Sequence, residues 1–147
     1  HQQKKDVSAI IAAHGIEYVG TTSAAYPLDL YDKFRKALTF GGVKYIHIHI
    51  PCPPGWGFAP QYAVKVGKLA VETGLFELSE IEHGRLRHTG ASRKLMEKRK
   101  LLPVREYFRS QSRFNAIPDE EIEAIQRNVT KRWECYFESL DDIEGEE

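Results

Sequence analysis

The stretch Tyr45-Ile-His-Ile-His-Ile-Pro-Cys-Pro-Pro-Gly-Trp-Gly-Phe58 decides how the chain is organised. Its first six residues favour a β-strand, and the strand stops at a proline that opens a loop rich in proline and glycine. The alternation of side chains predicts that one face of this strand is buried. The buried face is expected to carry Ile46, Ile48 and Ile50, and the opposite face Tyr45, His47 and His49.

Cys52 lies in this loop, between Pro51 and Pro53-Pro54. The prolines restrict the backbone and remove N–H donors, so we expect the loop to be stiff. The carboxyl end of a strand in an open α/β sheet is a common place for chemistry. Cys52 is therefore the candidate functional residue, either as a nucleophile or as a metal ligand. The alternative is a small buried hydrophobic residue without a chemical role.

The neighbours of Cys52 leave further alternatives open. Trp56 and Phe58 are expected to pack around the loop, either as an apolar shell for a metal cluster or as a plain anchor to the domain. His47 and His49 have a possible ligand spacing, but no nearby acidic residue or third histidine completes a metal site, which favours a packing role. Cys135 is predicted to be structural.

Helices and strands alternate along the first part of the chain. Helices are predicted over 6–15, 26–41 and 60–74, and strands over 18–22, 44–50 and 75–81. This order favours an α/β fold with a parallel or mixed sheet covered by helices. One face of the first helix is expected to carry Val7, Ile10, Ile11 and His14, and the apolar stripe of the second to consist of Leu28, Tyr31, Phe34 and Leu38. The inward face of the third helix is expected to carry Tyr62, Val66, Leu69, Ala70 and Thr73.

The character of the sequence changes after Gly84, which divides residues 1–84 from residues 85–147. Residues 85–100 are predicted to form a basic, extended arm with a strand-like start and a charged helical stretch, and a short helix is expected over 103–108. Pro118 precedes three acidic residues, which is typical of a helix start. The predicted apolar stripe of the helix that begins there consists of Ile122, Ile125, Val129, Trp133, Tyr136 and Leu140.

The composition is that of an ordinary globular protein. The 147 residues suffice for one domain with a core, the formal net charge is zero, and no apolar run approaches the roughly 20 residues of a membrane span. Two cysteines and no secretory signal indicate a reducing, cytoplasmic location. We expect neither nucleic acid nor a membrane among the partners.

The charges are nevertheless unevenly distributed. Residues 85–113 contain ten Lys or Arg and two Glu, and residues 138–147 contain six acidic residues and no basic ones. These runs are either solvated surface or a docking surface for an acidic partner. Phosphate-binding glycine motifs, GxSxG, HExxH and CxxC do not occur.

Several motifs carry a resemblance to a known family. They are Lys5-Asp6-Val7, residues 12–16, Ala25-Tyr26-Pro27, residues 45–47 with 51–57, residues 69–76, and in the tail Pro103-Val104, Tyr107, Gln111, Arg113-Phe114 and Trp133. With these motifs the chain resembles the carboxyl-terminal half of the β subunit of 2-oxoacid:ferredoxin oxidoreductases, most closely the pyruvate (pyruvate synthase) type.

The resemblance implies a fold and an activity. The fold would be the second half of a thiamine diphosphate-binding domain, a mostly parallel sheet flanked by helices, with a helical carboxyl-terminal extension. The enzyme would decarboxylate pyruvate oxidatively to acetyl-CoA, or catalyse the reverse, using thiamine diphosphate and Mg²⁺. Electrons would pass through a [4Fe–4S] cluster to ferredoxin. Cys52 matches the fourth cysteine ligand of that cluster.

The chain lacks other parts of the family pattern. The glycine–aspartate–glycine motif, its downstream asparagine and the three other cluster cysteines do not occur. The chain begins with His1 and with a helix that no strand precedes, so we expect it to be a fragment or one chain of a split subunit. All three cofactors would then require residues outside this chain, and residues that contact coenzyme A or the 2-oxoacid are not identified.

The resemblance leaves three questions open, each with two possible answers. The substrate is pyruvate or, as second choice, a branched-chain 2-oxoacid. The chain is part of the enzyme, working with its missing amino-terminal half or other subunits, or it is a non-catalytic assembly module in which Cys52 is structural. The basic stretch 85–113 either docks acidic ferredoxin or wraps a neighbouring subunit.

Overall fold

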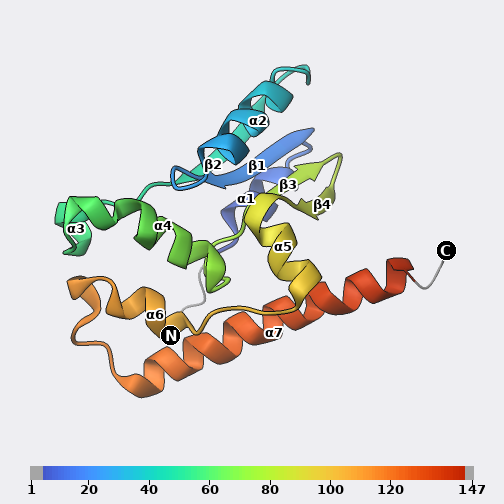
Figure 1. The fold of residues 1–147 in the computed structure, drawn as a ribbon. Helices are drawn as coiled ribbons and strands as arrows, with labels where there is room; N and C mark the ends of the chain where they lie inside the picture. The colour runs from blue at the N-terminus through green and yellow to red at the C-terminus, as the bar shows by residue number, and fades with distance from the viewer. Residues whose placement is uncertain (1–4, 145–147) are drawn as a thin grey trace.

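The computed structural model describes residues 5–144, with side chains described as far as residue 139 (Figure 1). It confirms the predicted α/β class. In chain order the elements are α1 (Val7–Ala12), β1 (Tyr18–Ser23), α2 (Pro27–Ala37), β2 (Lys44–His49), α3 (Pro53–Trp56), η1 (Pro60–Tyr62), α4 (Ala63–Glu72), β3 (Ser79–Glu82), β4 (Arg85–His88), α5 (Gly90–Lys98), α6 (Val104–Arg109), η2 (Ser112–Phe114) and α7 (Asp119–Glu144).

The four strands form one mixed sheet with the order β2-β1-β3-β4. Strands β1 and β2 are parallel, whereas β3 is antiparallel to both β1 and β4. The parallel pair follows from the helical crossover through α2, and the antiparallel pair β3–β4 follows from the tight turn at His83-Gly84. The sheet is therefore less parallel than the family resemblance implied, and β3 begins at Ser79 rather than at residue 75.

Residues 85–98 do not form the extended arm that we predicted. β4 pairs with β3, and α5 packs against α4. The backbone N–H of Leu78 donates to Oγ of Ser92 at 2.8 Å, and Met96 is buried. The two adjacent apolar residues Leu95 and Met96 thus anchor α5 to the core, although the other residues of this stretch are mostly polar or charged.

Helix α2 turns a polar face, not its predicted apolar stripe, toward the sheet. Lys33 is 1% exposed, and its Nζ donates to Asp29 at 2.6 Å and to Thr89 at 2.7 Å. Asp29 also accepts from the hydroxyl of Thr22 at 2.7 Å. Burial lowers the pKa of Lys33, and the hydrogen bond to Asp29 opposes that shift. A buried charge needs partners of this kind, so the polar residues occupy the inner face.

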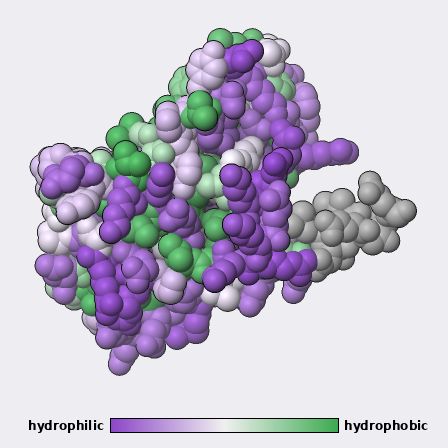
Figure 2. Space-filling model, viewed as in Figure 1, coloured by the Kyte–Doolittle hydropathy of each residue, from purple (hydrophilic) through white to green (hydrophobic). Residues whose placement is uncertain are grey.

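The apolar stripe of α2 consequently faces outward. Leu28 and Leu38 are 79% and 82% exposed, and Tyr31 and Phe34 are exposed as well. Apolar patches are visible around α2 in the upper part of Figure 2. The predicted apolar stripe is confirmed, but the described part of this chain does not cover it. The same holds for Val7 and Ile10 of α1, which are exposed, although the predicted helix start at Asp6 is confirmed by its hydrogen bond from Ala9 N at 2.9 Å.

The hydrophobic core lies between α4 and the helices α5, α6 and α7, which Figure 1 shows below the sheet. On α4 the predicted inward residues Val66, Leu69, Ala70 and Thr73 are buried, whereas Tyr62 is exposed. On α7 Ile122, Val129 and Trp133 are buried, and the side chain of Leu140 lies outside the described residues. No helix among the described residues is long and apolar enough to cross a membrane.

Trp133 is the central side chain of this core. It is completely buried, and its indole N–H donates to the carbonyl oxygen of Gly74 at 3.1 Å. Gly74 has a φ of 72°, and a Cβ there would lie 2.4 Å from Nε1 of Trp133. A glycine at the end of α4 therefore permits the close approach of α7.

Replacing Trp133 with alanine should lower the free energy of unfolding by roughly 3–5 kcal/mol, because it leaves a large cavity and removes a buried hydrogen bond. Urea unfolding measures this change. Cys135→Ala, an exposed position on the same helix, is the control and should stay within about 0.5 kcal/mol of the parent. Equal effects of the two substitutions would contradict this description of the core.

Glu80 on β3 is the centre of a charged cluster beside the sheet. Its side chain is 6% exposed and accepts hydrogen bonds of 2.9 Å from Tyr18, Lys36 and Arg87. Burial opposes ionisation, but these three hydrogen bonds prevail and lower the pKa of Glu80. Because the folded pKa lies below the ordinary value of 4.5, the stabilisation is present above that value and is lost as the pH falls through the folded pKa.

Glu80→Gln should therefore destabilise the protein at pH 7 by about 1–3 kcal/mol and make its stability less dependent on pH below 4.5. Denaturant unfolding of both proteins at a series of pH values tests this expectation. Glu97→Gln removes an exposed carboxylate from an ion pair on α5 and should change neither quantity measurably. Parallel pH curves for the parent and Glu80→Gln would contradict the role assigned to Glu80.

Candidate functional site

Cys52 lies at the start of a one-turn helix that the sequence did not predict. The residue itself is extended, with φ −107° and ψ 99°, and α3 begins at the next residue, Pro53. The backbone N–H of Trp56 donates to the carbonyl oxygen of Cys52 at 2.9 Å, and that of Gly57 donates to Pro53 at 2.9 Å. Proline at the first helical position and the left-handed Gly57 after the last one are the residues that such a turn requires.

The turn is fixed on its strand side by close packing against α4. Pro51 is buried. A Cβ added to Gly67 on α4 would lie 3.3 Å from Cγ of Pro51 and 2.6 Å from Cβ of Ala25. Gly67 thus allows α4 to approach the end of β2. This packing agrees with the restricted loop predicted from the prolines, whereas Ile50 of the predicted buried face is 63% exposed.

Cys52 is an exposed residue, so it is not the buried hydrophobic residue of the alternative interpretation. Gly55 lies directly beside it, because a Cβ at that position would be 3.2 Å from the Cys52 sulfur. A side chain at Gly55 would crowd the sulfur. The arrangement places one exposed cysteine on a short, well-held turn, which suits a thiolate ligand.

Aromatic rings pack against the turn. The ring of Trp56 lies 5.6 Å from that of His49 and 6.4 Å from that of Phe58, and His49 lies 5.0 Å from Phe76. Trp56 and Phe58 also pack against the hydrophobic core. They therefore anchor the loop, which confirms one of the two predicted alternatives, and an apolar shell around a metal cluster stays a prediction.

A second contact comes from a segment far along the chain. The guanidinium carbon of Arg113 lies 4.0 Å from the ring centroid of Trp56 and 4.4 Å from that of Phe114. The backbone N–H of Ser112 donates to the carbonyl oxygen of Gly57 at 3.0 Å. This contact was not predicted from the sequence, because stacking between residues so distant along the chain leaves no periodic signal.

A single cysteine cannot hold a metal cluster by itself. Among the described residues, no group of three or more His, Cys, Asp or Glu side chains is placed to bind a metal ion. His47 and His49 pack against the ring of Phe76. Cys135 is exposed on α7, and its predicted structural role stays a prediction. If Cys52 binds a metal cluster, the other ligands of that cluster have to come from outside the described residues.

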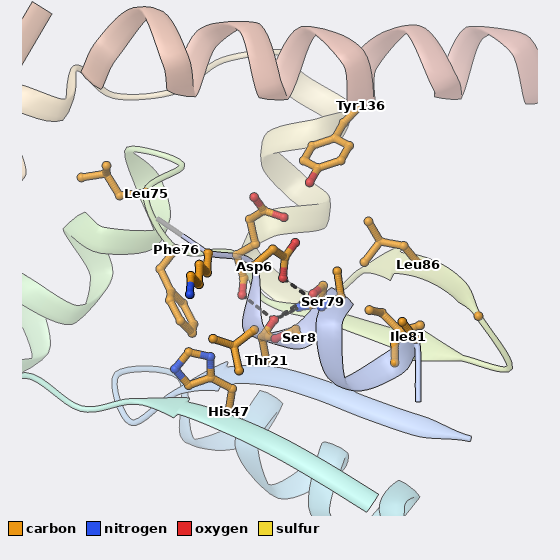
Figure 3. Close-up of a pocket in the computed structure, with 17 residues that line it drawn as sticks. Asp6, Ser8, Thr21, His47, Leu75, Phe76, Ser79, Ile81, Leu86 and Tyr136 are labelled. Carbon is orange, nitrogen blue, oxygen red and sulfur yellow. Dashed lines mark hydrogen bonds between the residues drawn. The ribbon is translucent and has the colours of Figure 1, made fainter. Parts of the chain in front are cut away.

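A cavity of about 460 Å³ lies beside His47 and Phe76 (Figure 3). Its lining includes Asp6 of α1, Thr21 of the sheet and Tyr136 of α7, but not Cys52. Thr21 is hydrogen-bonded in the wall to the hydroxyl of Ser79 at 2.8 Å. Burial and Glu77 raise the pKa of Tyr136, which keeps that phenol neutral.

Comparison with curated proteins shows extensive similarity to two kinds of subunit. The chain is 44% identical to the pyruvate synthase subunit PorB of Methanocaldococcus jannaschii over 129 residues, which cover 88% of this chain and 41% of that protein. It is 46% identical to the PorB subunit of Methanothermobacter marburgensis over 126 residues, 86% of this chain and 42% of that protein.

The second kind of relative is the ketoisovalerate oxidoreductase subunit VorB of Pyrococcus horikoshii, which is 35% identical over 133 residues, 90% of this chain and 42% of that protein. No family model matches the chain. The chain thus spans about two-fifths of the length of these relatives. The resemblance predicted from the sequence is confirmed: most of this chain is homologous to part of the β subunit of the 2-oxoacid:ferredoxin oxidoreductase family.

Proposed function

We propose that the chain is part of the β subunit of a thiamine diphosphate-dependent 2-oxoacid:ferredoxin oxidoreductase, and that Cys52 supplies one thiolate to its [4Fe–4S] cluster. The observation that supports this most directly is the exposed cysteine on a turn fixed at both ends. Iron–sulfur clusters are held by cysteine thiolates, and their potential depends on the surrounding hydrogen bonds and solvent exposure.

The chain's own contribution is to hold and orient that sulfur. The turn fixes the backbone of Cys52, Gly55 leaves space beside the sulfur, and the ring of Trp56 anchors the loop to the core. When bound, the cluster would pass single electrons. The diphosphate motif of the family is absent from this sequence, so thiamine diphosphate and Mg²⁺ are proposed to bind residues outside this chain.

Pyruvate is the proposed substrate, with coenzyme A as acyl acceptor. Of five relatives named pyruvate synthase subunits, four are 43–46% identical to the chain and the fifth, from Thermotoga maritima, is 36% identical, whereas the relatives named VorB are 35% identical. Branched-chain 2-oxoacids are the second candidate, because the VorB relatives carry the name of a ketoisovalerate enzyme.

The outward apolar stripe of α2 supports assembly with more protein. Leu28, Tyr31, Phe34 and Leu38 form an exposed apolar row on one helix. Such a row is unfavourable in water unless another surface covers it. We propose that the remainder of the subunit, or another subunit of the complex, covers this row.

The basic surface of α5 supports the proposed docking of ferredoxin. Arg93, Lys94 and Lys98 are exposed on this helix, whose other face packs on the core. Clustered surface charge attracts an oppositely charged partner over a distance set by the salt concentration. The acidic tail predicted from residues 138–147 lies largely outside the described side chains.

Cys52→Ala should remove the cluster from the complete enzyme and reduce electron transfer from the 2-oxoacid to ferredoxin at least about a hundredfold, because one of the cluster's anchoring thiolates is lost. Iron and acid-labile sulfide content, the electron paramagnetic resonance spectrum and ferredoxin reduction measure this loss. Cys135→Ala should leave all three unchanged. Full iron content and an intact spectrum in Cys52→Ala would favour the non-catalytic assembly module instead.

Reversing the charges of Arg93, Lys94 and Lys98 to glutamate should slow ferredoxin reduction about tenfold at low salt and weaken its dependence on ionic strength. Reduction of a small uncharged dye by the same variant is the control and should not change. If ferredoxin reduction and its salt dependence both match the parent enzyme, the basic surface does not dock ferredoxin.

A further inference from the structure

Arg113 is held against two aromatic rings. Its guanidinium carbon lies 4.0 Å from the ring centroid of Trp56 and 4.4 Å from that of Phe114. Its Nη2 also donates to the hydroxyl of Tyr107 at 3.3 Å. A planar guanidinium can stack its face on a ring while its N–H groups donate hydrogen bonds, whereas a lysine ammonium has no plane that can stack.

The stacked ring of Trp56 is coupled directly to Cys52. Trp56 is the last residue of α3, and its backbone N–H donates to the carbonyl oxygen of Cys52 at 2.9 Å. Because α3 has only one turn, a movement of Trp56 moves the backbone of Cys52 with it. The contact with Arg113 is therefore linked to the backbone of Cys52 through one ring and one hydrogen bond.

A second contact joins the same two segments. The backbone N–H of Ser112 donates to Gly57 at 3.0 Å, and a Cβ on Gly57 would lie only 1.9 Å from Oγ of Ser112. Gly57 also needs the left-handed conformation, with a φ of 72°. The turn after Cys52 and the segment Ser112–Phe114 are thus packed without space for one additional carbon atom.

We propose that Arg113 is a positioning residue for Cys52, acting through Trp56, and that segment Ser112–Phe114 sets where the cluster-binding sulfur lies. The proposal rests on the proposed role of Cys52 as a cluster ligand. It assigns to the helical extension a part in the redox site, in addition to any role of the basic residues in docking. A displaced sulfur would alter the geometry of the cluster and its potential without removing the ligand.

The test uses the complete enzyme with Arg113→Ala, Arg113→Lys and the control Arg109→Ala, an exposed arginine at the end of neighbouring α6. Hydrogen exchange of the amides of residues 55–58 is measured after removal of iron. We expect it to quicken about tenfold in Arg113→Ala, and in Arg113→Lys as well, because a lysine keeps the charge but loses the planar stack. Arg109→Ala should match the parent.

The iron-loaded variants are then compared by redox titration and by electron paramagnetic resonance. Arg113→Ala and Arg113→Lys should keep the full iron content but show a shifted potential and broadened cluster signals. Unchanged exchange and an unchanged potential in Arg113→Ala would overturn the proposal. Complete recovery by lysine would also overturn it, because charge rather than stacking would then hold the turn.

A second pair of variants keeps the proposal testable if Arg113→Ala does not fold. Gly57→Ala should disturb the turn, and adding Ser112→Gly should restore part of the parent exchange rate, because the colliding hydroxyl is removed. No recovery in the double variant would contradict the proposed packing. Cluster retention in Cys52→Ala would instead refute the proposed ligand role, while the hydrogen exchange of the turn would still decide whether Arg113 positions it.

Discussion

The candidate site depends on one constraint, a short turn that has little freedom to move. Pro51 is packed against α4 where Gly67 allows close approach, and Gly57 is packed against Ser112 where no side chain fits. Between these two points the backbone of Cys52 is extended and then enters a single helical turn. A ligand held in this way loses little conformational freedom when it binds a metal, so more of the binding free energy is retained.

The same structure shows surfaces that suit a part of a larger assembly. Helix α2 directs the ion pair of Lys33 and Asp29 inward and leaves Leu28 and Leu38 in solvent. The core is instead built by α4, α5, α6 and α7, around Trp133. These features agree with a chain that is homologous to about two-fifths of a longer subunit, in which additional protein would cover α2.

The sequence predicted the elements better than the faces they bury. Periodicity located α2 and α7, and the buried residues Val66 and Leu69 of α4 followed from their spacing. It could not show that α2 turns its polar side inward, because an amphipathic pattern does not identify which neighbour covers the apolar face. Cys52 was found from its prolines, whereas the stack of Arg113 on Trp56 depends on tertiary packing that local patterns do not encode.

A structure of the complete enzyme with its cluster bound is the most direct test of the role proposed for Cys52. We predict that its sulfur lies within bonding distance of an iron atom, with the turn from residue 51 to residue 57 still packed against Ser112–Phe114. A sulfur beyond bonding distance of every iron atom, or enclosed by aliphatic side chains of another subunit, would contradict that role.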